Sequence, residues 1–138
     1  MYWIRKSFFL RILACTVIFL IGCKTQEISL QATEWKLLHL GQDDVSMLQN
    51  PVTLTFTENE SRISGFGGCN RYFGSFSQSG NRISFTGVGS TKMYCDETMN
   101  VEDTFFRLLN EVDAFNVQGE KLVLLKGATP LLEFTRGR

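Results

Sequence analysis

The sequence predicts an α+β fold, mainly β, in which a curled antiparallel sheet of about seven strands, partly barrel-like, packs on one α-helix. Two observations predict its strands and its helix. Short runs of alternating apolar and polar residues recur along the chain and are separated by turn-forming residues. One stretch, residues 100–113, instead places its apolar residues at helical spacing. The apolar stripe of that helix needs a covering surface, and the sheet is the one available.

Seven segments have the strand pattern, and residues 52–57 have it most clearly. In that segment Val52, Leu54 and Phe56 alternate with threonines, which is typical of a half-buried strand. Glycine in the short loop at 78–80 between alternating runs predicts a hairpin. The predicted strands are residues 35–40, 52–57, 62–65, 72–77, 81–86, 121–125 and 131–135.

The predicted helix has an apolar stripe and a polar start. Asn100 is the expected N-cap, and Glu102 and Asp103 follow in the first turn, where the helix dipole favours anions. The stripe consists of Val101, Phe105, Leu108 and Val112, and Phe106 and Leu109 widen it.

The N-terminus has the pattern of a secretory signal. Residues 1–11 are basic, residues 12–21 form an apolar run, and Gly22 precedes Cys23. Ten helical residues rise about 15 Å, half of the bilayer core, so we do not expect a membrane span. The sequence therefore predicts a signal peptide over 1–22, a lipidated Cys23 with a polar tether over 23–33, and one domain over 34–138.

Residues 20–23 (LIGC) resemble the bacterial lipobox. The resemblance implies that Cys23 receives a diacylglyceryl group and that cleavage occurs just before it. Two or three acyl chains hold a protein firmly at a membrane. Lys24 follows, where an Asp would imply inner-membrane retention, so the resemblance implies an outer-membrane lipoprotein on the periplasmic face or the cell surface. The alternative is that Cys23 is an ordinary thiol in an uncleaved leader.

Charge and composition exclude several classes of function. The formal net charge is zero, but residues 1–22 hold three of the 14 cations and no acid, which leaves 11 cations against 14 acids. Such a mildly acidic domain lacks the excess of basic residues that binds the phosphates of nucleic acid. His39 is the only histidine, and we expect it on a strand surface or partly packed rather than as a metal ligand. No metal or other cofactor is predicted.

Two cysteines, Cys69 and Cys95, belong to the predicted domain. In an exported protein such a pair favours a disulfide, which would close a loop of about 26 residues and stabilise the fold by about 3 kcal/mol. Two buried free thiols and a redox pair are the alternatives, although no C-x-x-C motif is present.

Glycines gather in residues 65–72 (GFGGCNRY) and 87–92 (GVGSTK). Neither segment has the spacing of a phosphate-binding loop, and Asn70 stands where a dinucleotide fingerprint would have its third glycine. We interpret both segments as tight bends or bulges where the strands of the sheet curl.

Residues 68–76 (GCNRYFGSF), then residues 90–95 (STKMYC), then the Phe-rich helix and the last hairpin, resemble the META domain family, which includes the HslJ-type heat-shock lipoproteins of bacteria. The resemblance covers about residues 34–135, with Lys92 where arginine is commoner. It implies a curled sheet cradling one helix, a Cys69–Cys95 disulfide, and a link to envelope stress. The motif positions that it implies are Gly68, Asn70, Tyr72, Thr91 and Met93.

No catalytic residue is predicted, and we expect the protein not to be an enzyme. There is no G-x-S-x-G motif, and the adjacent acids Asp43-Asp44 and Asp96-Glu97 are interpreted as solvated turns rather than a glycosidase pair. We expect an outer-membrane-anchored binding or assembly module with an envelope protein partner. A carrier of a small apolar ligand or lipid is the alternative, because twelve phenylalanines could line a cavity.

Overall fold

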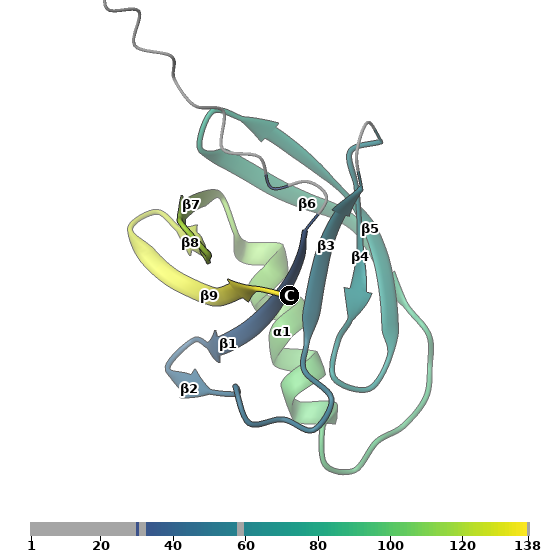
Figure 1. Ribbon diagram of the computed structural model, residues 1–138. Coiled ribbons are helices and arrows are strands. Elements are labelled where there is room, and N and C mark those ends of the chain that lie inside the picture. Colours follow the sequence, from purple (N-terminus) through teal and green to yellow (C-terminus); the bar gives the residue numbers. More distant parts are fainter. Residues whose placement is uncertain (1–29, 31–32, 58–59, 138) are drawn as a thin grey trace, which may run out of the picture.

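The computed structural model of the chain describes residues 30, 33–57 and 60–137. The predicted signal peptide, Cys23 and most of the predicted tether lie outside these residues. In the described part of the chain, nine antiparallel strands form one sheet that curls into a ring beside one helix, which confirms the predicted fold class (Figure 1). The elements are β1 (Glu34–Leu40), β2 (Asp43–Asp44), β3 (Thr53–Thr57), β4 (Arg62–Phe66), β5 (Arg71–Ser79), β6 (Arg82–Ser90), α1 (Met99–Glu111), β7 (Ala114–Gln118), β8 (Lys121–Lys126) and β9 (Thr129–Arg136).

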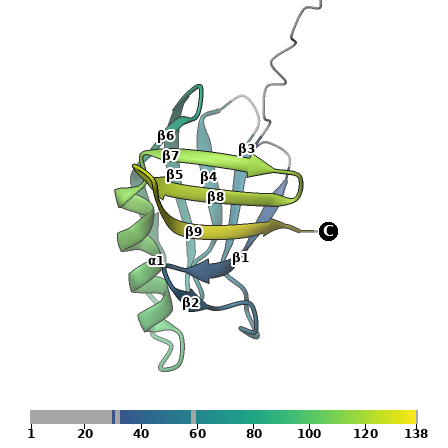
Figure 2. The same ribbon diagram turned by 90° about the vertical axis from the view of Figure 1, so that its left-hand side faces the viewer.

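The sheet closes on itself because β1 pairs with β9 as well as with β3. Trp35 lies opposite Arg136, and the guanidinium of Arg136 stacks over the Trp35 ring at 5.4 Å. The ring is weakest between β6 and β7, where Arg82 and Ala114 are the one pair in register. Helix α1 stands along the side of the ring and packs on β6, β9 and β1 (Figure 2). The helix thus supports the ring where strand pairing is thin.

The core fills the inside of the ring. The strands alternate, so that every second side chain points inward, as in β3, where Leu54 and Phe56 are buried. Phe56 meets Phe76 of β5 edge to face, with ring centroids 5.0 Å apart. From α1, Phe105 and Leu109 are fully buried, which places the predicted apolar stripe against the sheet.

His39 breaks the alternation of β1. Trp35 and Leu37 point inward, and strict alternation would place His39 inside with them. An irregularity in the pairing with β9 between Leu37 and His39 buries Leu40 instead. The imidazole stays partly exposed, with Nδ1 3.7 Å from the carboxylate of Glu133, on the strand surface where the sequence predicted it.

Two strands and the start of the helix differ from the sequence prediction. The segments Asp43–Asp44 and Ala114–Gln118 form β2 and β7, which raises the count from about seven strands to nine. The helix begins at Met99, one residue before the expected N-cap Asn100. Asn100 as the N-cap is therefore wrong: Thr98 holds that position, and it makes no side-chain capping bond. The first turn is instead fixed by a buried acid, described below.

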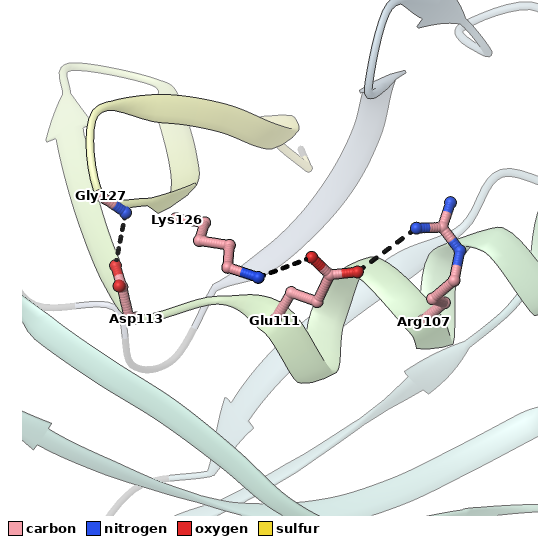
Figure 3. A network of polar contacts seen from close by, with 5 residues as sticks. All are labelled: Arg107, Glu111, Asp113, Lys126 and Gly127. Atoms are coloured by element: carbon pink, nitrogen blue, oxygen red, sulfur yellow. Dashed lines mark hydrogen bonds and ion pairs between the residues drawn. The ribbon is translucent and has the colours of Figure 1, made fainter.

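An exposed polar network ties the end of α1 to the last hairpin (Figure 3). Glu111 accepts hydrogen bonds from Lys126 Nζ at 3.0 Å and from Arg107 at 3.3 Å. The carboxylate of Asp113 accepts a hydrogen bond from the backbone N–H of Gly127 at 2.9 Å. The hydrogen bond from Lys126 is the main reason why the pKa of Glu111 lies below its ordinary value.

None of the helical segments in the described residues has the length and apolarity that crossing a bilayer requires.

Candidate functional site

The predicted motif residues meet where the loop between β4 and β5 lies against the first turns of α1. Residues 67–70 form a tight turn in which the Gly67 N–H donates to the carbonyl of Asn70 at 2.8 Å. Gly68 has φ +114°, a conformation that side chains disfavour. The turn points two consecutive backbone N–H groups, those of Cys69 and Asn70, at the helix.

Both of these N–H groups donate hydrogen bonds to the carboxylate of Glu102. Its carboxylate belongs to α1 and the residue is only 2% exposed. It accepts hydrogen bonds from the N–H of Cys69 at 3.0 Å, from the N–H of Asn70 at 2.6 Å and from Asn70 Nδ2 at 2.7 Å. A Cβ at Gly67 would come within 2.8 Å of Glu102 Oε2. Glycine at position 67 is therefore what lets the carboxylate approach the turn.

Asn70 links Glu102 to a third segment, the loop that precedes α1. Asn70 Oδ1 accepts hydrogen bonds from Thr91 Oγ1 at 2.8 Å and from the N–H of Met93 at 2.7 Å. Its Nδ2 also donates to the carbonyl of Met93 at 3.0 Å. The site needs a side chain with both a donor and an acceptor, which asparagine supplies and aspartate does not. We call this set of contacts between Glu102, Asn70, Thr91 and Met93 the clamp.

A disulfide between Cys69 and Cys95 lies beside the clamp, as the family resemblance implied. The two Cα atoms are 5.8 Å apart across a sequence separation of 26 residues. The bond joins the β4–β5 turn to the far end of the same loop that Asn70 holds at Met93. Residues 91–95 are thus fixed at both ends.

Tyr72 fixes the other side of the turn. Its hydroxyl donates to the carbonyl of Thr53 at 2.7 Å, and its ring packs against Phe105 and Phe106 of α1 with centroids 5.4 Å away. Burial raises the pKa of the phenol well above its ordinary value, so Tyr72 stays a neutral donor. A side chain at Gly65 would overlap the Thr53 carbonyl oxygen, which explains a glycine at that position.

The clamp leaves two large side chains in solvent. Met93 is 60% exposed and Tyr94 is 79% exposed, although the backbone of Met93 is bound on both sides by Asn70. A groove of about 460 Å³ lies between this loop and the β4–β5 turn, and Phe66, Asp96 and Glu97 contribute to its walls. We call it the loop groove.

A second groove, of about 610 Å³, lies on the outer face of β3, β4 and β5. It shares Asn50 and Phe66 with the loop groove, so the two are neighbours. The hydroxyls of Thr55 and Ser64 line it together with Phe73, which is 57% exposed. We call it the sheet groove.

The acid pairs singled out in the sequence remain apart. Asp43 and Asp44 form the exposed strand β2, and Asp96 and Glu97 lie exposed at the loop groove. Across the described ranges, no three acidic, histidine or cysteine residues come close enough together to hold a metal ion.

Glu102 lies in the first turn of α1, as the sequence predicts, but its burial was not predicted. The sequence indicated only an anion that the helix dipole favours. The structure buries it under the β4–β5 turn. The signal was present in Gly67, Gly68 and Asn70, since a glycine-rich turn with free N–H groups needs an acceptor.

The comparisons with known proteins show the family and the fold of the chain. The model of a family described as META domain matches residues 28–138. A protein from Burkholderia xenovorans solved by NMR is similar to the chain, with 28% sequence identity, a TM-score of 0.65, and coverage of 78% of this chain and 83% of that one.

Two further solved structures share the fold. A second NMR structure is 24% identical with a TM-score of 0.61, and covers 77% of this chain and 91% of its own. A crystal structure of a DUF4847-family protein from Bacteroides vulgatus ATCC 8482 is 14% identical with a TM-score of 0.57, over 77% of this chain and 93% of its own. No curated protein matches the chain.

Proposed function

Because the chain belongs to the META domain family, we propose that it is an outer-membrane-anchored lipoprotein whose META domain is a non-catalytic binding or assembly module for an envelope protein, with a role in envelope stress. One observation carries the proposal. Met93 and Tyr94 are held in solvent by a loop that the clamp and the disulfide fix at both ends.

Exposed apolar side chains on a rigid backbone suit protein recognition. Tyrosine and methionine are enriched at interfaces, where a few such side chains provide most of the binding free energy. A backbone already fixed in one conformation loses little entropy when a partner binds. The loop groove, which Met93 lines, offers a concave surface on the same loop. In this proposal the clamp and the disulfide support binding by fixing the backbone of the loop, and they take no part in a reaction.

The proposed anchor is compatible with this surface. The chain enters the ring at β1, where buried Leu30 accepts a hydrogen bond from Trp35 Nε1 at 3.2 Å. Leu30 lies seven positions after Cys23, and a chain of that length spans at most about 25 Å. The start of β1 pairs with the end of β9, and Figure 2 shows the C-terminus on the side of the ring away from α1. The loop leading into α1 is therefore free to face away from the membrane.

The carrier alternative receives less support from the phenylalanines. Six of them, Phe56, Phe76, Phe85, Phe105, Phe115 and Phe134, are buried in the core. The ring of Phe56, for example, packs against the rings of Phe76 and Phe85. Aromatic rings that pack on one another are filling space that a ligand would need.

Site-specific photocrosslinking in cells tests the partner. A photoreactive amino acid replaces Tyr94 in one strain and Ala128 in another, since Ala128 is exposed in the β8–β9 turn. We expect a discrete protein adduct from position 94 that position 128 does not form. Equal adducts from both positions, or none from position 94, would contradict the partner.

The intact mass of the protein from membranes tests the anchor separately. We expect a chain that starts at Cys23, carries acyl groups, and has lost two hydrogens to the disulfide. Recovery of a full-length chain with an unmodified Cys23 would contradict the anchor. The binding surface would still be tested by the crosslinks.

A further inference from the structure

The sheet groove differs in chemistry from the loop groove. On the outer face of β1, β3, β4 and β5, the last three strands carry hydroxyl side chains that face one another across neighbouring strands, as where Thr55 lies opposite Ser64. Ser64 in turn lies opposite Phe73, and Phe66 lies opposite Arg71. The groove therefore offers two aromatic faces, several hydroxyls, one guanidinium and, on β1, the carboxylate of Glu34.

The charge of this face is opposite to that of the domain. Outward positions of these four strands, all of which the structure describes, carry Lys36, Arg62 and Arg71 against one acid, Glu34. Arg71 and Glu34 line the groove itself, and Lys36 and Arg62 lie elsewhere on the same face. The chain from Cys23 onward has 11 cations against 14 acids. A cationic face on an acidic domain is complementary to an anion, and a guanidinium binds a carboxylate through two parallel hydrogen bonds.

The backbone N–H and C=O groups of the strands under the groove already pair with neighbouring strands. β3 pairs with β1 and β4, and β4 pairs with β3 and β5. A peptide could not add as a new strand there, because strand addition needs a free sheet edge. A ligand must instead be recognised by side chains: a ring face on Phe66 or Phe73, hydroxyl groups on the threonines and Ser64, and an anion on Arg71.

We infer that the sheet groove binds a carboxylate-bearing glycan. A sugar ring has an apolar face for the phenylalanines and hydroxyl groups that both donate and accept hydrogen bonds. Arg71 and Phe73, two residues apart on one face of β5, are separated by about 7 Å along the strand. The four strands span about 14 Å, so the groove accommodates a short stretch of an extended glycan. This site borders the loop groove at Phe66 but does not include Met93 or Tyr94, and it needs no anchor.

Calorimetric titration of the full chain in detergent with tetragalacturonate, a carboxylate-bearing oligosaccharide, tests the inference. Its methyl ester, which lacks the charges, is the matched ligand. We expect saturable binding that weakens at least about tenfold in Arg71→Gln, in Phe73→Ala and with the ester, and that falls as salt rises. Both side chains are exposed, so these variants are expected to fold, and the thermal transition of each checks that they do.

Two variants serve as controls for position. Arg107→Gln removes an exposed arginine from α1, and Tyr94→Ala removes an exposed aromatic from the loop. Both should bind tetragalacturonate as the parent does. The inference is overturned if the parent does not bind, if the ester binds equally well, or if the Tyr94 variant loses binding while the Arg71 and Phe73 variants keep it. The last outcome would place the ligand on the loop surface.

Discussion

Asn70 Nδ2 donates to Glu102 Oε1 at 2.7 Å, and this buried bond joins the β4–β5 turn to helix α1. It also explains the residue types around it. Gly67 leaves room for the carboxylate, and Met93 is held through its backbone while its side chain stays in solvent. The residues that the sequence resemblance singled out lock three segments of this chain together.

Replacing Glu102 by alanine should destabilise the fold strongly. Three donors, the N–H groups of Cys69 and Asn70 and the Nδ2 of Asn70, would lose a buried acceptor. We expect a loss of about 3 kcal/mol in the free energy of unfolding, measured by urea denaturation. Asp103→Ala, at the exposed neighbouring position, is the control and should cost less than about 0.5 kcal/mol. Equal losses in the two variants would show that the Glu102 bonds carry no net stability.

Asn70→Asp should make stability depend on pH. The new carboxylate would face Glu102 Oε1 and the carbonyl of Met93, where Asn70 now donates. Two carboxylates in contact raise the pKa of the pair in the folded state. A raised folded pKa contributes stability that is present at low pH and lost as pH rises through it. The deficit of this variant relative to the parent should therefore shrink from about pH 7 to about pH 4. Urea denaturation at both values checks this, and a deficit independent of pH would argue against contact between the carboxylates.

Lys126→Met should remove a pH-dependent contribution at the end of α1. The Lys126 hydrogen bond, with the lysine charge and Arg107 as smaller causes, lowers the pKa of Glu111 below its ordinary value of 4.5. A depressed folded pKa contributes stability that is present above that ordinary value and lost as pH falls through the folded pKa. The variant should therefore be less stable than the parent at about pH 6, and the difference should shrink as the pH falls below 4.5. Because the pair is exposed, the difference is expected to be small and to fade in high salt.

Gly65→Ala should be far more damaging than alanine at another glycine. The added Cβ would overlap the Thr53 carbonyl oxygen and crowd the Tyr72 ring, and neither is free to move because they bond to each other. We expect a loss above about 3 kcal/mol, seen as a lower thermal midpoint. Gly80→Ala meets no neighbouring atom and costs only the strain of its positive φ, about 1 kcal/mol. Similar midpoints for the two variants would contradict the close approach at Gly65.

Much of the fold was predictable because its signals are local. The alternation of residues 52–57 predicts β3 and its inward face, and the apolar stripe of residues 101–112 predicts α1. Strand β7 was missed because Ala114–Gln118 buries two consecutive residues before it alternates, and its partner is the next hairpin. Strand β2 has two residues and forms only because β1 lies beside it.

The clamp could be predicted only in part. The positions of Asn70, Thr91 and Met93 followed from the family resemblance, but their contacts join residues more than twenty positions apart. Glu102 had a sufficient local explanation in the helix dipole, and nothing in the sequence near it indicates burial. The exposure of Tyr94 and the two grooves likewise depends on how the ring closes. The lipid anchor and the non-enzymatic role stay predictions.

Native-state hydrogen exchange of the full chain tests most directly whether the motif is a structural clamp. The N–H groups of Cys69, Asn70 and Met93 lie outside the strands, so as ordinary loop residues they would exchange fast. If the clamp holds as described, they exchange as slowly as the amides of β8 and β9, and Glu102→Ala accelerates the exchange of Cys69 and Asn70 more than that of the β8 and β9 amides. Fast exchange of all three in the parent protein would contradict it.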